Sequence, residues 1–166
     1  MTKYFPMQTR LTTILPALIV AATVASAAHA QNRALQQQLQ QAARVDCVFS
    51  TIATSDWDDD SAAISTEDTE FAASFFDIDV EGGTAESEGR FGASYIIVRF
   101  AEGYLHFMQT LNAGPIYLTT VLAEPAGDGR FKAVHTRHEY TAVSLPGFTS
   151  RPEMYVGDCS VEMTQN

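Results

Sequence analysis

Short segments rich in β-branched and aromatic residues alternate with glycine-containing turns from residue 45 to the end of the chain. The clearest turns are Glu81–Thr84, Ala101–Gly103 and Ala126–Gly129. Connections this short join antiparallel neighbours, whereas parallel strands need helical crossovers between them. The spacing therefore predicts a mainly β protein, an antiparallel meander of about seven or eight strands that forms a small barrel or a sandwich.

The strand signal is carried by eight segments: residues 45–53, 71–81, 84–88, 91–100, 104–110, 116–123, 130–142 and 154–163. Between the first two lies a polar, acidic stretch, 54–70, which we predict to be a loop. Trp57 within it has two interpretations. It is either an exposed docking aromatic or a side chain that folds back over an open barrel end.

The N-terminal residues 1–30 have the three parts of a secretory signal peptide. Lys3 and Arg10 accompany a mostly apolar run over 11–24, and a small-residue pattern ending at Ala30 predicts cleavage before Gln31. An uncleaved anchor is the alternative, although the run is shorter than the roughly 20 apolar residues of a spanning helix. We therefore expect bacterial Sec-type export to the periplasm or the cell exterior, with no stable membrane insertion after cleavage.

Two segments follow the expected cleavage site. Residues 31–44 are rich in Gln, Ala and Leu and predict a short N-terminal helix, with Leu35 and Leu39 on one face. A more specific alternative for this segment is a glutamine-rich coiled-coil seam, but the repeat is too short to support one. Residues 45–166 form the predicted β-domain.

The chain has two cysteines, Cys47 and Cys159, which fall on the first and last predicted strands. Two cysteines in an exported chain usually pair. We expect their disulfide to seal a barrel seam or to join a sheet edge, and closing so long a loop contributes about 4–5 kcal/mol in the chain-entropy model. A metal site or a catalytic thiol is the alternative, but neither cysteine has a neighbouring cysteine ligand.

The charge balance is strongly acidic, with 10 Lys and Arg against 20 Asp and Glu and a formal net charge of −10. Binding to nucleic acid or to anionic lipid depends on cationic residues, so both are poor candidate partners and we expect neither. A small apolar ligand, a basic protein or a divalent metal fits the charge. The simplest interpretation is that acidity keeps an exported protein dispersed.

The densest group of polar residues lies on the strand 130–142. Strand alternation places His135, Arg137 and Glu139 on one face and His138 on the other. The first three predict either an anion site with His135 as a proton carrier, in a barrel mouth or on the exterior, or an ion-paired, solvated strand face. His106 lies on the strand 104–110, and a third ligand for a zinc or copper site is not evident.

An irregular calcium site is a weaker prediction of the acidic stretch. Asp56, Asp58, Asp60 and Glu67 supply hard oxygen ligands, but Ser61 stands where an EF-hand loop needs glycine. A solvated acidic loop is the default interpretation. We accordingly predict no resident metal and no cofactor.

Two functional hypotheses remain. The first is a non-enzymatic β-domain that binds a ligand or partner outside the inner membrane, with His106, His135, Arg137, His138 and Trp57 as the candidate binding residues. The second is a small metal-dependent or histidine-based hydrolase built on His106, His135, Arg137 and His138. No G-x-S-x-G pattern marks an activated serine, and no catalytic residue is predicted.

The C-terminal third of the chain resembles a group of small exported bacterial β-domains of unknown function. The resemblance is carried by Thr119-Thr120-Val121, by the run Ala133–His138 and by the run Tyr155–Cys159. It implies bacterial export, and it implies no activity, substrate or cofactor.

Overall fold

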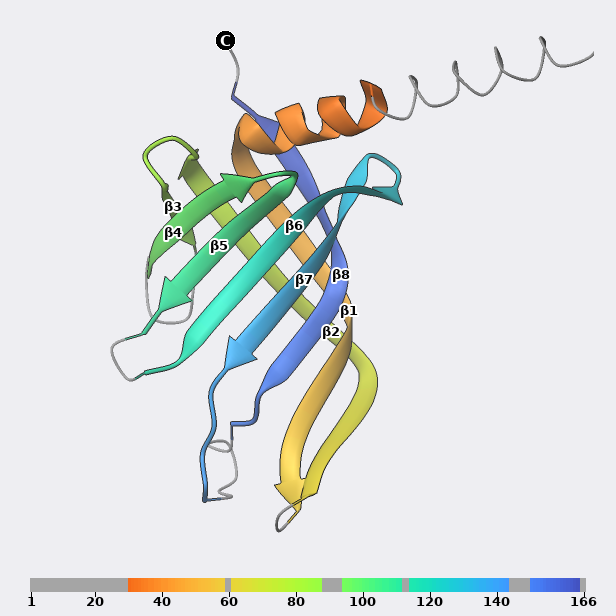
Figure 1. Cartoon of the computed structure of the whole chain (residues 1–166), viewed down its shortest axis with the longest axis vertical. Coiled ribbons are helices and arrows are strands. Elements are labelled where there is room, and N and C mark those ends of the chain that lie inside the picture. Colours follow the sequence, from red (N-terminus) through yellow and green to blue (C-terminus); the bar gives the residue numbers. More distant parts are fainter. Residues whose placement is uncertain (1–29, 59–60, 88–93, 112–113, 144–149, 165–166) are drawn as a thin grey trace, which may run out of the picture.

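The computed structural model describes residues 30–58, 61–87, 94–111, 114–143 and 150–164, so the predicted signal peptide lies outside the described residues except for Ala30. Eight antiparallel strands form one sheet that closes into a barrel (Figure 1). The strands are β1 (Ala42–Asp58), β2 (Ser61–Asp79), β3 (Thr84–Ser87), β4 (Ser94–Ala101), β5 (Tyr104–Thr110), β6 (Ile116–Gly127), β7 (Arg130–His138) and β8 (Glu153–Met163).

Each strand pairs with the next along the chain, and β8 returns to pair with β1. The predicted antiparallel meander is confirmed, and its form is a barrel. Alternate side chains point inward, as they do along every barrel strand. The core is formed by Leu39, Ala42, Val45, Cys47, Phe49, Ile52, Phe75, Ala85, Ile96, Val98, Leu105, Phe107, Val121, Ala123, Phe131, Ala133, Tyr155 and Cys159.

The seam between the first and last strands is closed by the disulfide. Cys47 and Cys159 are register partners on β1 and β8, with their Cα atoms 4.0 Å apart, and both are buried. The bond therefore joins the two ends of the meander across the ladder that closes the ring, as the sequence predicts.

A helix over residues 30–40 lies across one end of the barrel (Figure 1). Leu39 on this helix is fully buried in the barrel core, and Leu35 packs against the same core. The prediction that the helix continues to residue 44 is wrong, because the chain enters β1 at Ala42, where its backbone pairs with β8. No helix in the described ranges is both long and apolar enough to cross a membrane.

The helix also covers the turn between β4 and β5. Glu102 and Gly103 have φ angles of 49° and 85°, which are the left-handed values that a two-residue hairpin requires. A β-carbon on Gly103 would lie 3.3 Å from Cγ of Gln36 on the helix. The predicted turn is thus present, and it is packed closely under the helix.

The prediction of a loop over 54–70 is wrong. β1 continues to Asp58 and β2 begins at Ser61, so this stretch is a two-stranded ribbon that extends past the end of the barrel (Figure 1). β8 accompanies β1 only as far as the pair Thr54 and Glu153. Side chains on the β2 half of the ribbon are mostly exposed, so the sequence lacks the apolar alternation of a half-buried strand.

β1 and β8 approach closely at one point. Gly157 is the register partner of Phe49, and the register shifts between Phe49 and Thr51. A β-carbon on Gly157 would lie 2.1 Å from the carbonyl oxygen of Val48 and 2.6 Å from Cα of Phe49. Only a residue without a side chain fits there.

Candidate functional site

The barrel interior changes in character along its axis. Toward the helix it is apolar, and the rings of Phe75 and Phe107 stack with centroids 4.1 Å apart. Toward the other end, polar side chains and aromatic rings share the inner face. We call this group the interior cluster. Its members are Phe71, Tyr117, His135, Arg137, Glu139, Glu153 and Tyr155.

Strand alternation positions the cluster. Phe131, Ala133 and His135 are buried on the inner side of β7, and Arg137 follows in the same phase. The register sets Glu153 opposite Arg137 and Tyr155 opposite His135 on β8. The face predicted to carry His135, Arg137 and Glu139 therefore points inward and is not a solvated outer face.

Arg137 lies among three aromatic rings. The central carbon of its guanidinium is 4.7 Å from the ring centroid of Phe71, 5.1 Å from that of Tyr155 and 5.6 Å from that of Tyr117. Its Nη1 donates to a carboxylate oxygen of Glu153 at 3.4 Å. Its Nε is buried and has no hydrogen-bond partner among the described residues.

The two tyrosines of the cluster donate to carboxylates. The Tyr117 hydroxyl lies 2.6 Å from Glu139, and the Tyr155 hydroxyl lies 2.5 Å from Glu153. Burial, followed by the hydrogen bond to Glu139, raises the pKa of Tyr117 to about 12. Burial and the hydrogen bond to Glu153 also raise the pKa of Tyr155. Both hydroxyls therefore keep their protons at neutral pH.

His135 is the most enclosed polar member, with 5% of its surface exposed. Its Nδ1 is 2.8 Å from the hydroxyl of Thr119, and its ring contacts Phe71 at 5.0 Å and Tyr155 at 5.6 Å. Burial, with a smaller contribution from the charge of Arg137, lowers its pKa to about 4. The ring is neutral at pH 7, and its Nε2 has no partner in the described structure.

Two nitrogen atoms of the cluster are buried and have no hydrogen-bond partner among the described residues. Nε of Arg137 always carries a hydrogen, and Nε2 of His135 carries one when the Thr119 hydroxyl donates to Nδ1. Both atoms can therefore act as hydrogen-bond donors. Side-chain exposures of 28% for Arg137 and 22% for Glu153 show that the cluster is open to solvent on one side.

The other predicted histidines lie outside the barrel wall. His106 bonds to the hydroxyl of Thr120 at 2.9 Å, and its ring stacks on Tyr104, which is exposed. His138 is exposed and contacts Thr136 on its own strand. The structure therefore does not bring these two histidines together with His135, which is the arrangement that the hydrolase hypothesis needs.

Trp57 lies on the protruding ribbon. It is 52% exposed, and its ring meets the edge of Tyr140 with centroids 5.3 Å apart. The proposed fold-back over the barrel end is absent, because β1 carries Trp57 past the barrel.

The predicted calcium ligands are spread along the ribbon. Asp56 pairs with Ala63 and Glu67 with Ile52, a separation of four residues, or about 13 Å along a strand. Asp56 forms an ion pair with Arg151 at 2.8 Å. Asp60 and the side chain of Asp58 lie outside what the structure describes. Among the described residues no three His, Cys, Asp or Glu side chains gather as metal ligands.

Several residues in and around the cluster were not predicted as binding residues from the sequence. Phe71, Tyr117, Glu153 and Tyr155 come from three other strands, as does Thr119, which bonds to His135, and their meeting depends on the barrel register. The alternation of each strand does contain a signal. Tyr117 and Thr119 are two residues apart and therefore point to the same face of the sheet, as do Glu153 and Tyr155. The pairing of β6 and β8 with β7 brings these faces together into one site.

The fold and the cluster define a class, an eight-stranded up-and-down β-barrel with an apolar interior at its helix-covered end and a polar, aromatic interior at the other. No protein-family model, curated protein or solved structure matches the chain. The functional argument accordingly depends on the interior cluster.

Proposed function

We propose that the chain is an exported, non-enzymatic binding protein that holds one small molecule in the interior cluster. Eight-stranded barrels have an interior that is either filled by side chains or able to hold one small ligand. Here the end of the barrel near the helix is filled, and the cluster occupies the other end.

Two unpaired atoms carry the proposal. Buried polar atoms nearly always have a hydrogen-bond partner, and leaving one unpaired costs about 1–3 kcal/mol. Nε2 of His135 and Nε of Arg137 both lack a partner in the described structure, and both belong to one cluster. A ligand that supplies an acceptor oxygen to these donors removes that cost.

The charges of the cluster select the kind of ligand. Arg137 contributes one positive charge, the carboxylates of Glu139 and Glu153 contribute two negative charges, and His135 is neutral. An anionic ligand is repelled by the carboxylates, so a neutral carbonyl group is the preferred acceptor. The rings of Phe71 and Tyr155 favour a flat, apolar body. We therefore propose a small, neutral, planar molecule that bears a carbonyl oxygen.

Benzamide, benzoate and benzylamine test this proposal as a matched set, because they share a ring and differ in head-group charge. Their binding to the oxidised protein is measured by isothermal titration calorimetry at pH 7. We expect benzamide to bind most tightly, benzoate more weakly and benzylamine weakest, since an ammonium group offers no acceptor. Tightest binding of benzylamine would show that the carboxylates, and not the unpaired donors, define the site.

Variants locate the binding. His135→Phe and Arg137→Met remove the unpaired donors, and we expect each to weaken benzamide binding about fivefold or more, which is the value of one hydrogen bond. His106→Phe is the matched control, because His106 also bonds to a threonine but on the outer face. Equal losses in His106→Phe and His135→Phe would contradict an interior site. Circular dichroism confirms that each variant is folded.

Export is the second part of the proposal. It is supported by the signal pattern of residues 1–30 and by the disulfide, which persists in oxidising compartments. Expression in a bacterium, followed by fractionation and N-terminal sequencing, tests it. We expect a mature protein outside the cytoplasm that begins at Gln31. An intact N-terminus in the cytoplasmic fraction would refute export.

A further inference from the structure

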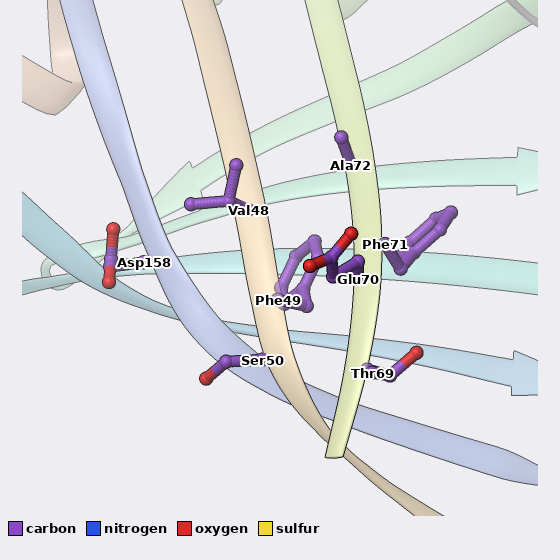
Figure 2. A pocket seen from close by; sticks show the side chains of 8 residues that line it. All are labelled: Val48, Phe49, Ser50, Thr69, Glu70, Phe71, Ala72 and Asp158. Carbon is purple, nitrogen blue, oxygen red and sulfur yellow. The ribbon is translucent and has the colours of Figure 1, made fainter.

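Among the described residues, one edge of β2 has few strand pairs. β2 pairs with β1 along almost its whole length, but with β3 only at Phe75, Phe76 and Asp79. The other edge of β2 from Ser61 to Ser74 therefore presents backbone groups with no strand partner among the described residues. Figure 2 shows β8, β1 and β2 side by side, and strands cross behind them at a steep angle.

The side chains along this edge have a single sign of charge. Glu67, Asp68 and Glu70 are exposed, and the range Ser61–Ser74 has no Lys, Arg or His. Ile64 on the same stretch is 77% exposed. An unpaired strand edge is a template for an added strand, and acidic side chains on it repel a second copy of the same edge. They attract a segment rich in Lys or Arg.

A hollow on the sheet surface adjoins the edge. It has a volume of about 400 Å³, and its lining residues are Val48, Phe49, Ser50, Thr69, Glu70, Phe71, Ala72 and Asp158 (Figure 2). It lies where the register between β1 and β2 shifts, so that Thr69 and Glu70 stand opposite the single residue Ser50. The bulge opens the surface and leaves Glu70 at the side of the hollow formed by β2.

We propose that the free edge of β2 binds an extended, basic segment of another protein by strand addition. Backbone hydrogen bonds to the edge supply affinity, and the hollow supplies selectivity. An added strand lies about 4.8 Å from β2, so a lysine or arginine side chain on it reaches Glu70 and lays its apolar stem over Ala72. Phe71 lines the hollow and also belongs to the interior cluster, but the other members of that cluster do not line the hollow.

A peptide of about ten residues that alternates lysine and valine is the probe. Its binding is measured by fluorescence polarisation, and its position by amide hydrogen exchange with mass spectrometry. We expect exchange to slow within Ser61–Ser74 and to stay unchanged in β5 and β6. A peptide of equal charge in which prolines replace the central valines cannot pair with an edge, and we expect its affinity to fall at least tenfold. Equal binding of both peptides would overturn strand addition, because it would leave charge as the sole attraction.

Variants distinguish the effect of the acidic residues on the β2 edge from that of the protein's overall negative charge. The triple change Glu67→Gln, Asp68→Asn and Glu70→Gln is expected to weaken the lysine–valine peptide at least tenfold. The matched control carries Glu81→Gln, Glu102→Gln and Glu124→Gln, which remove the same charge elsewhere, and we expect less than a threefold loss. Similar losses in both variants, protection of a strand other than β2, or no binding of the peptide to the native protein would each overturn the proposal. So would a dimer joined through β2 in sedimentation experiments.

Discussion

Thr119 and His135 are register partners on β6 and β7, and the threonine hydroxyl lies 2.8 Å from Nδ1 of the histidine on the inner side of the wall. The next residue, Thr120, makes a similar contact with His106 at 2.9 Å on the outer side. The two pairs have the same chemistry and differ in burial. The buried Nε2 of His135 has no hydrogen-bond partner among the described residues, which is the basis of the proposed ligand site.

The pH dependence of stability reports on the same burial. The pKa of His135 is lowered from 6.5 to about 4, so the ring stays neutral in the folded state while the unfolded state takes up a proton. The unfolded state therefore binds more protons between these values, and the free energy of unfolding falls as pH falls from 6.5 to about 4. This group contributes about 3 kcal/mol to that fall.

Chemical denaturation at several pH values between 4 and 7 measures this loss. We expect His135→Phe to have a clearly shallower dependence than the native protein, because the variant has no ring to protonate. The contribution of His135 is fully present above pH 6.5. There the free energies of unfolding of the variant and of the native protein should change with pH in the same way. Identical slopes below pH 6.5 would mean that the pKa of His135 is the same in the folded and unfolded states.

Removal of the seam disulfide should destabilise the barrel. Cys47 and Cys159 are 112 residues apart in sequence, and their bond closes the ring between β1 and β8. We expect the double variant Cys47→Ala, Cys159→Ala to lose about 4 kcal/mol of unfolding free energy in urea. The native protein under reducing conditions is the control and should lose a similar amount. Unchanged stability in both would show that the β1–β8 ladder closes the ring unaided.

Gly157→Ala should lower the free energy of unfolding strongly, although it adds only one methyl group. The added methyl group would lie 2.1 Å from the carbonyl oxygen of Val48, so β1 has to move away from β8. We expect a loss of about 3 kcal/mol, at the upper end for overpacking a well-packed site. Val156→Ala, at an exposed neighbouring position, is the control and should change stability by about 0.5 kcal/mol. Thermal denaturation compares the two variants directly, and a mild effect of Gly157→Ala would contradict the close approach of the strands.

Leu39 tests whether the helix is a structural cover. Its side chain is fully buried at the end of the barrel, so Leu39→Ala leaves a cavity there, and we expect a loss of about 3 kcal/mol. Gln40→Ala, on the exposed side of the same helix, should be within about 0.5 kcal/mol of the native protein. Urea denaturation measures both. Equal stability of the two variants would show that the helix detaches without cost.

The fold was largely predictable because its signals are local. Turn residues such as Gly103 and alternation in β5 and β7 define strands without knowledge of their partners, and Cys47 and Cys159 mark the seam. The ribbon of β1 and β2 was missed because its exposed side chains carry no apolar alternation. The end of the helix was misplaced because pairing of Ala42 with β8 is a long-range interaction that local propensity does not contain.

The candidate site was predictable only in part. The phase of β7 placed His135, Arg137 and Glu139 on one face, but it did not indicate whether that face was inside or outside. Tyr155 and Glu153 join them through the register of β8, which depends on the closure of the ring. In the sequence, the residues of an interior barrel site therefore appear only as same-face residues on several separate strands. Strand pairing in the folded barrel brings them together.

The most direct test of the interior site is a nuclear magnetic resonance titration of the histidine rings in 15N-labelled protein. Benzamide is added at pH 7, and the ring nitrogens are observed by long-range proton–nitrogen correlation. Our account predicts a saturable shift at Nε2 of His135, with His106 and His138 unchanged because they lie outside the wall. A His135 signal that stays fixed at saturating benzamide, or that moves no more than that of His106, would contradict the proposal that the unpaired donors of the interior cluster bind a ligand.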